Sequence, residues 1–393
     1  MAITPKIQKI PEAHATKGRG AASNMSGRYE IITSDAYDDG WNQQQSKEND
    51  DFSAPALVTE VFKENAKSIL TRNASPDIPF NVSLNPYRGC EHGCIYCYAR
   101  PSHSYLNLSP GLDFETKIFA KVNAAELLTT ALAKPSYIPE AIALGVNTDM
   151  YQPCEREYKI TRQVLEVLWR YRHPAYLITK NSLIERDIDL LSAMAAQKLV
   201  STSITITTLD HDISRILEPR CSSPARRLNT VRRLSEAGVP VEVNIAPIIP
   251  FITDSELEKI IAAAAQAGAA SIHYIILRLP WEVSPLFEQW LETHFPQRAE
   301  RVMNRIRDMR GGKNNDSQFG SRMRGEGIWA DLLQQRFRKA ATQHQVYSRE
   351  KGFNALDCSQ FRPPSHKAAL KQKVKQTAKL ANKDKNDSQL NLF

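Results

Sequence analysis

Residues 85–100 read NPYRGCEHGCIYCYAR and place Cys90, Cys94 and Cys97 close together with the spacing C-x3-C-x2-C. Gly89 and Gly93 flank the first and second of these cysteines. Glycine adopts backbone conformations that other residues rarely reach, and a tight loop requires such conformations. We therefore expect this stretch to form a loop in which three thiol groups converge on one centre.

The other three cysteines, Cys154, Cys221 and Cys358, are scattered singly along the chain. This distribution is not a disulfide framework, and clustered cysteines in a cytoplasmic protein usually bind metal or carry out redox chemistry. Zinc would need a fourth ligand such as His92 or His103. Ferredoxin-type clusters take a fourth cysteine from a nearby run, and none follows closely here. Three thiolates on a [4Fe-4S] cluster would leave one iron open for a substrate or cofactor.

With Tyr96 directly before its last cysteine, the motif resembles the signature of the radical S-adenosylmethionine (SAM) superfamily. The resemblance implies that Cys90, Cys94 and Cys97 ligate a [4Fe-4S] cluster and that SAM is the second cofactor. It places Tyr96 in an aromatic position beside both cofactors. It also implies that the loop follows the first strand of a parallel barrel.

Strand patterns and helix patterns alternate along the chain around this loop. Six βα units in one parallel sheet predict an α/β fold, a partial (β/α)6 radical SAM barrel with N- and C-terminal extensions. A doubly wound open sheet would show the same alternation. Asn123 with Glu126, and Thr253 with Glu256, are expected to cap two of the helices. The predicted strands are 80–84, 141–146, 175–179, 200–207, 241–246 and 271–277, and the predicted helices are 123–134, 158–171, 186–199, 224–238, 253–268 and one after 281.

The ends of the second and third strands carry polar residues, and α/β barrels bind ligands at the carboxyl ends of their strands. In radical SAM enzymes the segment after the second strand binds the methionyl amino group, which implies SAM contacts for Asn147, Thr148 and Asp149. An ordinary turn after a strand has the same composition. Lys180 follows the third strand and is expected to pair with the methionyl carboxylate as a point charge.

The fourth and fifth strands supply further candidates for contacts to SAM. Ser203, Thr205 and Thr207 alternate along the fourth strand, so they share one face, which suits ribose hydroxyls. Half-buried strands are rich in threonine for other reasons as well. Asn244 on the fifth strand lies where the adenosyl group is expected to pack.

The residues around the motif resemble the spore photoproduct lyase-like "DNA repair photolyase" branch, and in particular a bacterial subgroup of it without an assigned reaction. The resemblance rests on residues 85–90, on 97–100 and on the Asn-Thr-Asp-x-Tyr-Gln-Pro segment at 147–153. It makes Tyr96 and Tyr98 candidates for radical return, although either tyrosine could instead pack beside the cluster. Spore photoproduct lyases carry a hydrogen-donating cysteine where this chain has Val146, which puts thymine-dimer reversal by that route in doubt. Cys154 is the remaining candidate donor, or an inert small hydrophobe.

Composition and charge divide the 393 residues into four parts. We predict a largely disordered or wrapping N-terminal extension at 1–57, a core at 58–295, a helical Arg- and Gly-rich extension at 296–362 and a basic tail at 363–393. The net charge is +8, and residues 298–339 carry nine Arg and two Lys against five acidic residues. Such patches suit nucleic acid. The sequence contains neither a membrane-spanning apolar run nor a signal-peptide core, so a cytoplasmic location is expected.

The resemblance implies a radical SAM enzyme that reductively cleaves SAM and uses a 5′-deoxyadenosyl radical to abstract hydrogen from a substrate. A nucleic-acid lesion or nucleotide is the first substrate class, and a peptide or small molecule is the second. A flavodoxin or ferredoxin is the expected one-electron donor. A non-catalytic iron-sulfur redox or sensor protein and a structural zinc protein are the alternatives from other classes.

Overall fold

A computed structural model of the chain describes residues 17–29, 57–348 and 356–364. Its larger sheet has the strand order β11-β10-β9-β8-β7-β6-β3-β2. Six neighbouring strands run parallel: β3 (Val82–Leu84), β6 (Ile142–Leu144), β7 (Ala175–Thr179), β8 (Val200–Thr205), β9 (Val241–Ile248) and β10 (Ser271–Ile276). β2 (Leu70–Arg72) pairs antiparallel with β3, and β11 (Tyr347–Ser348) pairs parallel with β10.

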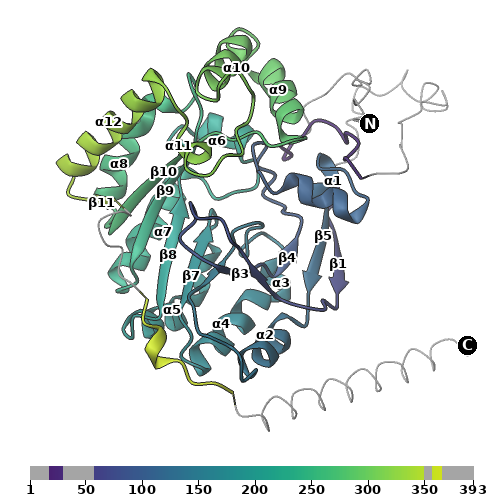
Figure 1. Cartoon of the computed structure of the whole chain (residues 1–393), viewed down its shortest axis with the longest axis vertical. Coiled ribbons are helices and arrows are strands. Elements are labelled where there is room, and N and C mark those ends of the chain that lie inside the picture. The colour runs from purple at the N-terminus through teal and green to yellow at the C-terminus, as the bar shows by residue number, and fades with distance from the viewer. Residues whose placement is uncertain (1–16, 30–56, 349–355, 365–393) are drawn as a thin grey trace, which may run out of the picture.

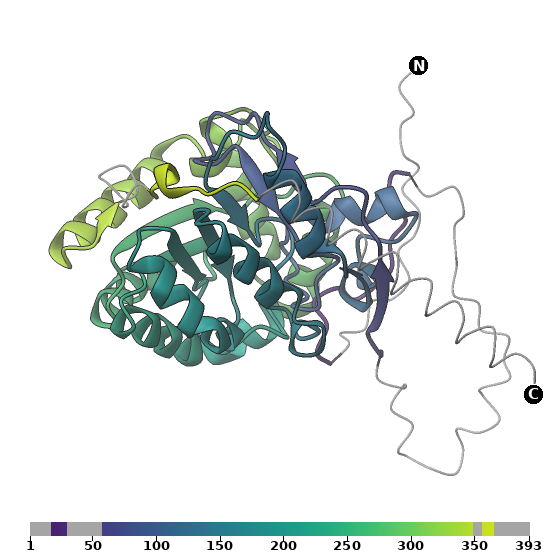
Figure 2. The same cartoon turned by 90° about the horizontal axis from the view of Figure 1, so that it is seen from below.

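The six parallel strands follow one another in sequence order across the sheet, which confirms the predicted partial (β/α)6 barrel. A doubly wound sheet would reverse its strand order at a switch point, and that alternative is therefore wrong. The curved sheet and the helices outside it are visible in Figures 1 and 2. These helices are α2 (Ala124–Leu132), α4 (Ile160–Arg170), α5 (Ile188–Ala195), α7 (Pro224–Glu236), α8 (Leu257–Gln266) and α9 (Val283–His294).

Alternation along each strand separates the packed side of the sheet from its polar side. On β8, Val200 and Ile204 belong to the main hydrophobic core, whereas Ser201, Ser203 and Thr205 point the opposite way. The helices complete that core with apolar faces such as Val164, Leu165 and Leu168 of α4. β8 therefore presents polar side chains to the inner face of the barrel.

A second, smaller sheet with the order β1-β5-β4 packs beside the barrel, and the sequence patterns do not reveal it. It consists of β1 (Glu60–Glu64), β4 (Tyr87–Arg88) and β5 (Lys117–Lys121), with short helices η2 (Arg100–Leu106) and α1 (Leu112–Thr116) before β5. Because β4 directly precedes Gly89, this sheet fixes the start of the cysteine loop. The other short helices in the barrel are α3 (Glu155–Tyr158), η3 (Ser182–Asp187), α6 (His211–Leu217) and η4 (Asp254–Glu256).

Two predicted helix caps are wrong because their side chains bind elsewhere. The side chain of Asn123 accepts a hydrogen bond from Ala66 N and donates one to Ala66 O. Thr253 Oγ1 accepts from Ile249 N, and Glu256 accepts from Thr208 and Leu209. Asn123 and Glu256 thus contact distant segments instead of forming the local cap, whereas Thr253 bonds to a residue four positions before it.

Segments on both sides of the barrel pack against it. The described N-terminal residues 17–29 contact it through Arg19, Ser23 and Arg28. The C-terminal extension contains α10 (Ala299–Asp308), α11 (Ser321–Arg324), α12 (Ile328–Gln343) and η6 (Cys358–Gln360). Arg336 Nε of α12 pairs with Glu258 of α8 at 2.7 Å, and both views place α12 at one edge of the molecule (Figures 1 and 2). Most of the predicted disordered extension and basic tail (1–16, 30–56 and 365–393) lies outside the described residues.

No helix in the described ranges is both long and apolar enough to span a bilayer.

Candidate functional site

The cysteine loop, residues 89–98, follows the carboxyl end of β3 and is tightly wound. Gly89 and Gly93 have φ angles of 72° and 66°, which favour glycine. A Cβ atom at Gly93 would lie 2.7 Å from Glu115 Oε2, so a side chain at this position would also clash. The carbonyl of each cysteine accepts a hydrogen bond of 3.2–3.3 Å from the amide three residues later, with Gly93, Cys97 and Arg100 as donors.

A fully buried ion pair holds this loop from behind. Arg100 Nη2 lies 2.5 Å from Glu115 Oε1, and both side chains are 0% exposed. The guanidinium also donates to Cys94 O at 2.9 Å and to Gly93 O at 3.0 Å. Glu115 in turn accepts the backbone amides of residues 20 and 21. One arginine thus links the loop to the N-terminal segment.

The three motif cysteines offer soft sulfur donors that suit an iron-sulfur cluster. Cys90 and Cys94 are buried and Cys97 is partly buried. Burial, together with the negative charges of Cys94 and Cys90, raises the pKa of Cys97 to about 12. The three thiol groups are therefore close enough to interact electrostatically. A hydrogen bond from Cys221, whose sulfur lies 3.8 Å away, lowers the pKa of Cys94 to about 7. The donor set fits the cluster that the sequence motif implies.

Within the described ranges, no three His, Cys, Asp or Glu side chains are arranged to hold a single metal ion. A zinc site requires its ligands to converge on one ion. Thiolates on a cubane cluster bind different irons, so they need not converge on one point.

Inside the cysteine loop, His92 joins the loop to the second and third strand ends. His92 Nδ1 lies 3.3 Å from Asp149 Oδ2, and its Nε2 lies 3.1 Å from Asn181 Nδ2. Asp149 also accepts hydrogen bonds from Thr179 Oγ1 at 2.7 Å and from Lys180 N at 2.8 Å. Burial opposes ionisation of Asp149, but the His92 charge and these hydrogen bonds lower its pKa to about 2. Asp149 is therefore an anion that fixes the backbone at Lys180.

Two other residues after the second strand face the cysteine loop. Thr148 is buried and its hydroxyl donates to Tyr87 O at 2.8 Å. Asn147 is exposed, and its backbone amide donates to Asn85 Oδ1 at 3.0 Å. The predicted SAM contacts at Asn147, Thr148 and Asp149 therefore lie together beside the cysteine loop, and Thr148 and Asp149 already have protein partners.

Lys180 and Asn244 have polar groups without a matching protein partner. Among the described residues no carboxylate lies within ion-pair distance of Lys180, whose Nζ is 5.9 Å from the centre of the Tyr96 ring. Burial lowers the pKa of Lys180, but the charges of Cys94 and Glu218 outweigh it and raise this pKa. Asn244 Oδ1 is buried and accepts no hydrogen bond. Both groups are thus available to a bound molecule.

The predicted ribose contacts lie on the inner face of the barrel. Ser203 is fully buried and its hydroxyl is 3.4 Å from Glu242 Oε1. Thr205 pairs in register with Asn244 of the neighbouring strand. These residues therefore share one polar wall, on the same face as Asn244.

The two motif tyrosines have different environments. Tyr96 is buried, and its hydroxyl donates to Glu218 and lies 3.4 Å from Thr207 Oγ1. Tyr98 is 49% exposed and its hydroxyl donates to Val146 O. Of these two tyrosines, only Tyr98 thus presents a large accessible surface, and its hydroxyl binds the backbone at Val146.

Cys154 lies outside the cysteine loop, at the N-terminal cap of α3. Its backbone amide donates to Glu91 Oε1 at 2.7 Å. Burial and the neighbouring Glu91 carboxylate raise the pKa of the Cys154 thiol, which keeps it protonated.

Sequence reasoning did not select Glu218, Arg227 or Cys221. Glu218 and Arg227 form a buried ion pair, and Arg227 Nη1 also donates to Thr205 O at 3.0 Å. Burial raises the pKa of Glu218, but the Arg227 charge and then the Lys180 charge outweigh it and lower this pKa. Glu218 and Cys221 follow α6, which no sequence pattern predicted, and Arg227 lies in the predicted helix α7. No local sequence pattern indicates that these three residues meet beside Tyr96 and Cys94.

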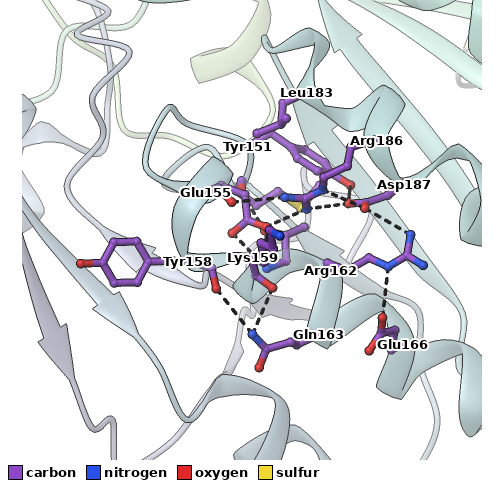
Figure 3. Close-up of polar contacts among 12 residues, drawn as sticks. Tyr151, Glu155, Tyr158, Lys159, Arg162, Gln163, Glu166, Leu183, Arg186 and Asp187 are labelled. Carbon is purple, nitrogen blue, oxygen red and sulfur yellow. Dashed lines mark hydrogen bonds and ion pairs between the residues drawn. The ribbon is translucent and has the colours of Figure 1, made fainter.

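A network of charged side chains connects the segment after β6 with the segment after β7 (Figure 3). Arg186 Nη2 donates to Glu155 Oε1 and to Asp187 Oδ2, both at 2.8 Å. Tyr151 donates to Asp187 at 3.0 Å, and Tyr87 donates to Glu155. Because Tyr87 lies just before Gly89, this network also positions the cysteine loop.

The family model of the Radical SAM superfamily matches residues 84–264, which span the loop and most of the barrel described above. Residues 84–264 of the chain therefore match the radical SAM superfamily. An uncharacterised protein of Mycobacterium tuberculosis is 35% identical over 226 residues, which cover 57% of this chain and 66% of that protein. An uncharacterised protein of Methanocaldococcus jannaschii is 26% identical over 246 residues, covering 63% of this chain and 88% of that protein. The match therefore spans slightly less than two thirds of the mycobacterial relative.

Among solved structures, this chain is similar to spore photoproduct lyase complexed with dinucleoside spore photoproduct. The TM-score is 0.53 at 14% identity, covering 73% of this chain and 81% of that chain. A double mutant of that enzyme with bound AdoMet and dinucleoside spore photoproduct gives a TM-score of 0.53 at 15% identity, covering 73% of this chain and 80% of that chain. At these identities the likeness concerns the fold.

Proposed function

We propose that this chain is a radical SAM enzyme in which Cys90, Cys94 and Cys97 hold a [4Fe-4S] cluster. When bound, the cluster and SAM supply reductive cleavage of the sulfonium, giving methionine and a 5′-deoxyadenosyl radical that abstracts hydrogen from the substrate. The observation that carries the proposal is the set of three thiols on one loop at the carboxyl ends of six parallel strands. A flavodoxin or ferredoxin is the proposed electron donor.

The protein's own part in this reaction is to bind and orient SAM. Lys180 carries a positive charge without a carboxylate partner among the described residues, and it pairs with the methionyl carboxylate. Asp149 holds the backbone at Lys180, while Asn147 and Thr148 complete the loop around the methionyl end. Asn244 Oδ1 accepts a hydrogen bond from the adenosyl group, and Ser203 and Thr205 line the same wall.

Three residues are the proposed participants in hydrogen transfer. Tyr98 is accessible and adjoins Val146, so it is the candidate in contact with substrate. Tyr96 is buried against Glu218, and its ring lies beside Lys180, the proposed partner of the methionyl carboxylate. Cys154 remains a candidate because a hydrogen-atom donor must keep its proton, and its raised pKa ensures this.

The proposed substrate is a nucleic-acid lesion or nucleotide. The basic stretch at 298–339 supports this class, since it carries nine Arg and two Lys against five acidic residues. The shared fold with an enzyme solved in complex with a dinucleoside photoproduct supports it as well.

Anaerobic SAM cleavage tests the proposed function. The full chain would be reconstituted with iron and sulfide, reduced with dithionite and mixed with SAM, and 5′-deoxyadenosine and methionine would be quantified. We expect product from the wild type, and neither product nor cluster iron in Cys94→Ala. Cys358→Ala is the matched control, because this cysteine lies in η6, outside the site. Iron and turnover in Cys94→Ala would refute the ligand assignment, and a loaded, reduced wild type without turnover would favour the redox or sensor role.

A further inference from the structure

Arg278 is a largely desolvated cation without a carboxylate partner at the mouth of the barrel. It lies two residues after β10, the sixth parallel strand. Its Nε is buried and makes no hydrogen bond. In the part of the chain that the structure describes, its one side-chain hydrogen bond runs from Nη1 to the sulfur of Met323, at 3.6 Å. No described carboxylate lies within ion-pair distance of it. A buried guanidinium left in this state is costly, because desolvation is not offset by an anion.

The neighbouring arginines do have partners. Arg322 Nε and Nη2 each lie 2.6 Å from a carboxylate oxygen of Asp77. Arg310 donates to Leu277 O at 2.8 Å and to Arg322 O at 3.0 Å. Burial and the Arg322 charge both lower the pKa of Arg278. Arg310 therefore has backbone carbonyls and Arg322 has a carboxylate as partners, whereas the described hydrogen bonds and ion pairs of Arg278 include neither.

The position of Arg278 is on the substrate side of the proposed active site. The charges of Arg278, Lys180 and Arg322 all act on the Tyr98 hydroxyl and favour its ionised form. Lys180 lies toward Cys94, whereas Arg278 lies under α11. Figure 1 shows α11 near the end of β10. An anion bound to Arg278 would thus lie beside Tyr98, the last residue of the cysteine loop.

Next to these arginines lies an exposed aromatic side chain on which a planar ring could stack. Phe319 is 57% exposed, and the guanidinium of Arg322 lies 4.7 Å from the centre of its ring. Nucleic-acid bases stack on exposed aromatic and guanidinium groups, whereas phosphates form bidentate contacts with arginine. A free cation next to a stacking surface therefore matches a nucleotide better than a carboxylate of a peptide.

We propose that Arg278 binds a backbone phosphate of the substrate and so places the adjoining nucleotide against Tyr98. This assignment rests on the proposed function, and it specifies how a nucleic-acid substrate is held. It makes Arg278 a binding residue for the substrate, distinct from the residues that hold SAM.

Binding of a labelled oligonucleotide to the full chain tests the assignment. The probe is a fluorescein-labelled single-stranded 12-nucleotide DNA, compared with the same sequence carrying uncharged methylphosphonate linkages. We expect Arg278→Gln to weaken binding of the phosphodiester probe on the order of 10- to 100-fold. We also expect the slope of log affinity against log salt to fall by about one, with no change for the uncharged probe.

Matched controls separate this effect from net charge and from folding. Arg232→Gln removes the same charge from an exposed position on α7 and should bind the probe as the wild type does. Arg278→Lys should restore part of the affinity, because it keeps the charge without the bidentate geometry. Thermal unfolding of Arg278→Gln should occur at the wild-type temperature or above it, since an unpaired buried charge is removed.

Several outcomes would overturn the proposal. Equal losses in Arg278→Gln and Arg232→Gln would show that only net charge matters, and a lowered Tm of Arg278→Gln would show a structural role. Preferential, Arg278-dependent binding of an acidic peptide would assign the site to carboxylates. SAM cleavage by the wild type, measured in parallel, keeps the two proposals apart. Cleavage without an Arg278 effect refutes this site alone, and an Arg278 effect without cleavage refutes the proposed function.

Discussion

Arg100 and Glu115 show how much of the cysteine loop depends on a single buried charge pair. Arg100 binds the carbonyls of residues 93 and 94, while Glu115 receives the amides of residues 20 and 21. Neither side chain reaches solvent. An arginine three residues after the last cysteine of the motif gives no hint in the sequence that a distant carboxylate will pair with it.

We expect Glu115→Gln to lower the free energy of unfolding by about 3–5 kcal/mol, because it leaves the Arg100 charge buried without its partner. Urea denaturation of the full chain measures this change, and iron uptake on reconstitution should fall in parallel. Glu166→Gln is the control, because it removes a carboxylate of the same charge from the half-exposed ion pair with Arg162. This change should lower the free energy of unfolding by less than about 1 kcal/mol. If both variants lower the free energy of unfolding by the same small amount, the buried pair does not hold the loop.

At the scale of elements, His173 joins α4, the start of β7 and the segment at 356–364. It is fully buried, its Nδ1 donates to Pro174 O at 3.0 Å, and the Tyr137 hydroxyl lies 2.7 Å from its Nε2. Its ring meets Phe361 edge to face at 5.2 Å. With Nδ1 as donor and Nε2 as acceptor, the ring is neutral in the folded chain.

Burial lowers the pKa of His173 from 6.5 to about 4, so acid should weaken this junction. The unfolded chain binds the proton below pH 6.5, whereas the folded chain resists it until about pH 4. The contribution to stability is therefore complete above pH 6.5 and is lost as the pH falls from 6.5 toward 4. Between pH 7 and pH 5 the wild type should lose about 2 kcal/mol more than His173→Gln. Urea denaturation of both proteins at the two pH values checks this difference. An equal loss of the free energy of unfolding in the two proteins would contradict it.

At the scale of the whole molecule, periodicity predicted the barrel because the predicted strands bury one face or both. The pattern at 200–207 located β8, and Pro224 marked the start of α7 correctly. The smaller sheet was not predictable, because β4 has two residues and β1 is largely exposed. Such strands carry no clear apolar pattern.

The candidate site divides in the same way. The cysteines are visible as a local motif, whereas Glu218 and Arg278 are brought to the site only by tertiary structure. Asn123 and Glu256 show the opposite failure: a local cap signal is present, but the side chain binds a distant segment instead. Local sequence therefore reveals the cysteines proposed to hold the cluster better than it reveals the groups that surround them.

The C-terminal extension crosses the barrel mouth and is held there by Asp77, in the connection between β2 and β3. Asp77 receives two hydrogen bonds of 2.6 Å from Arg322 and one of 3.3 Å from Gly320 N. Both side chains of the ion pair are largely buried, at 11% and 13% exposure, so the contact is shielded from solvent. This single contact joins residues 245 positions apart in the sequence.

We expect Asp77→Asn to release the extension from the mouth without unfolding the barrel. An amide side chain cannot offer two anionic oxygens to the guanidinium, so amide hydrogen exchange in residues 318–325 should accelerate on the order of tenfold or more. Exchange measured by mass spectrometry on the full chain resolves this segment from the barrel strands, which should keep their wild-type protection. Asp308→Asn, which removes an exposed partner of Arg305 on α10, is the control and should leave the segment unchanged. Wild-type protection of 318–325 in Asp77→Asn would mean that the backbone contacts of Arg310 suffice to hold α11 over the mouth.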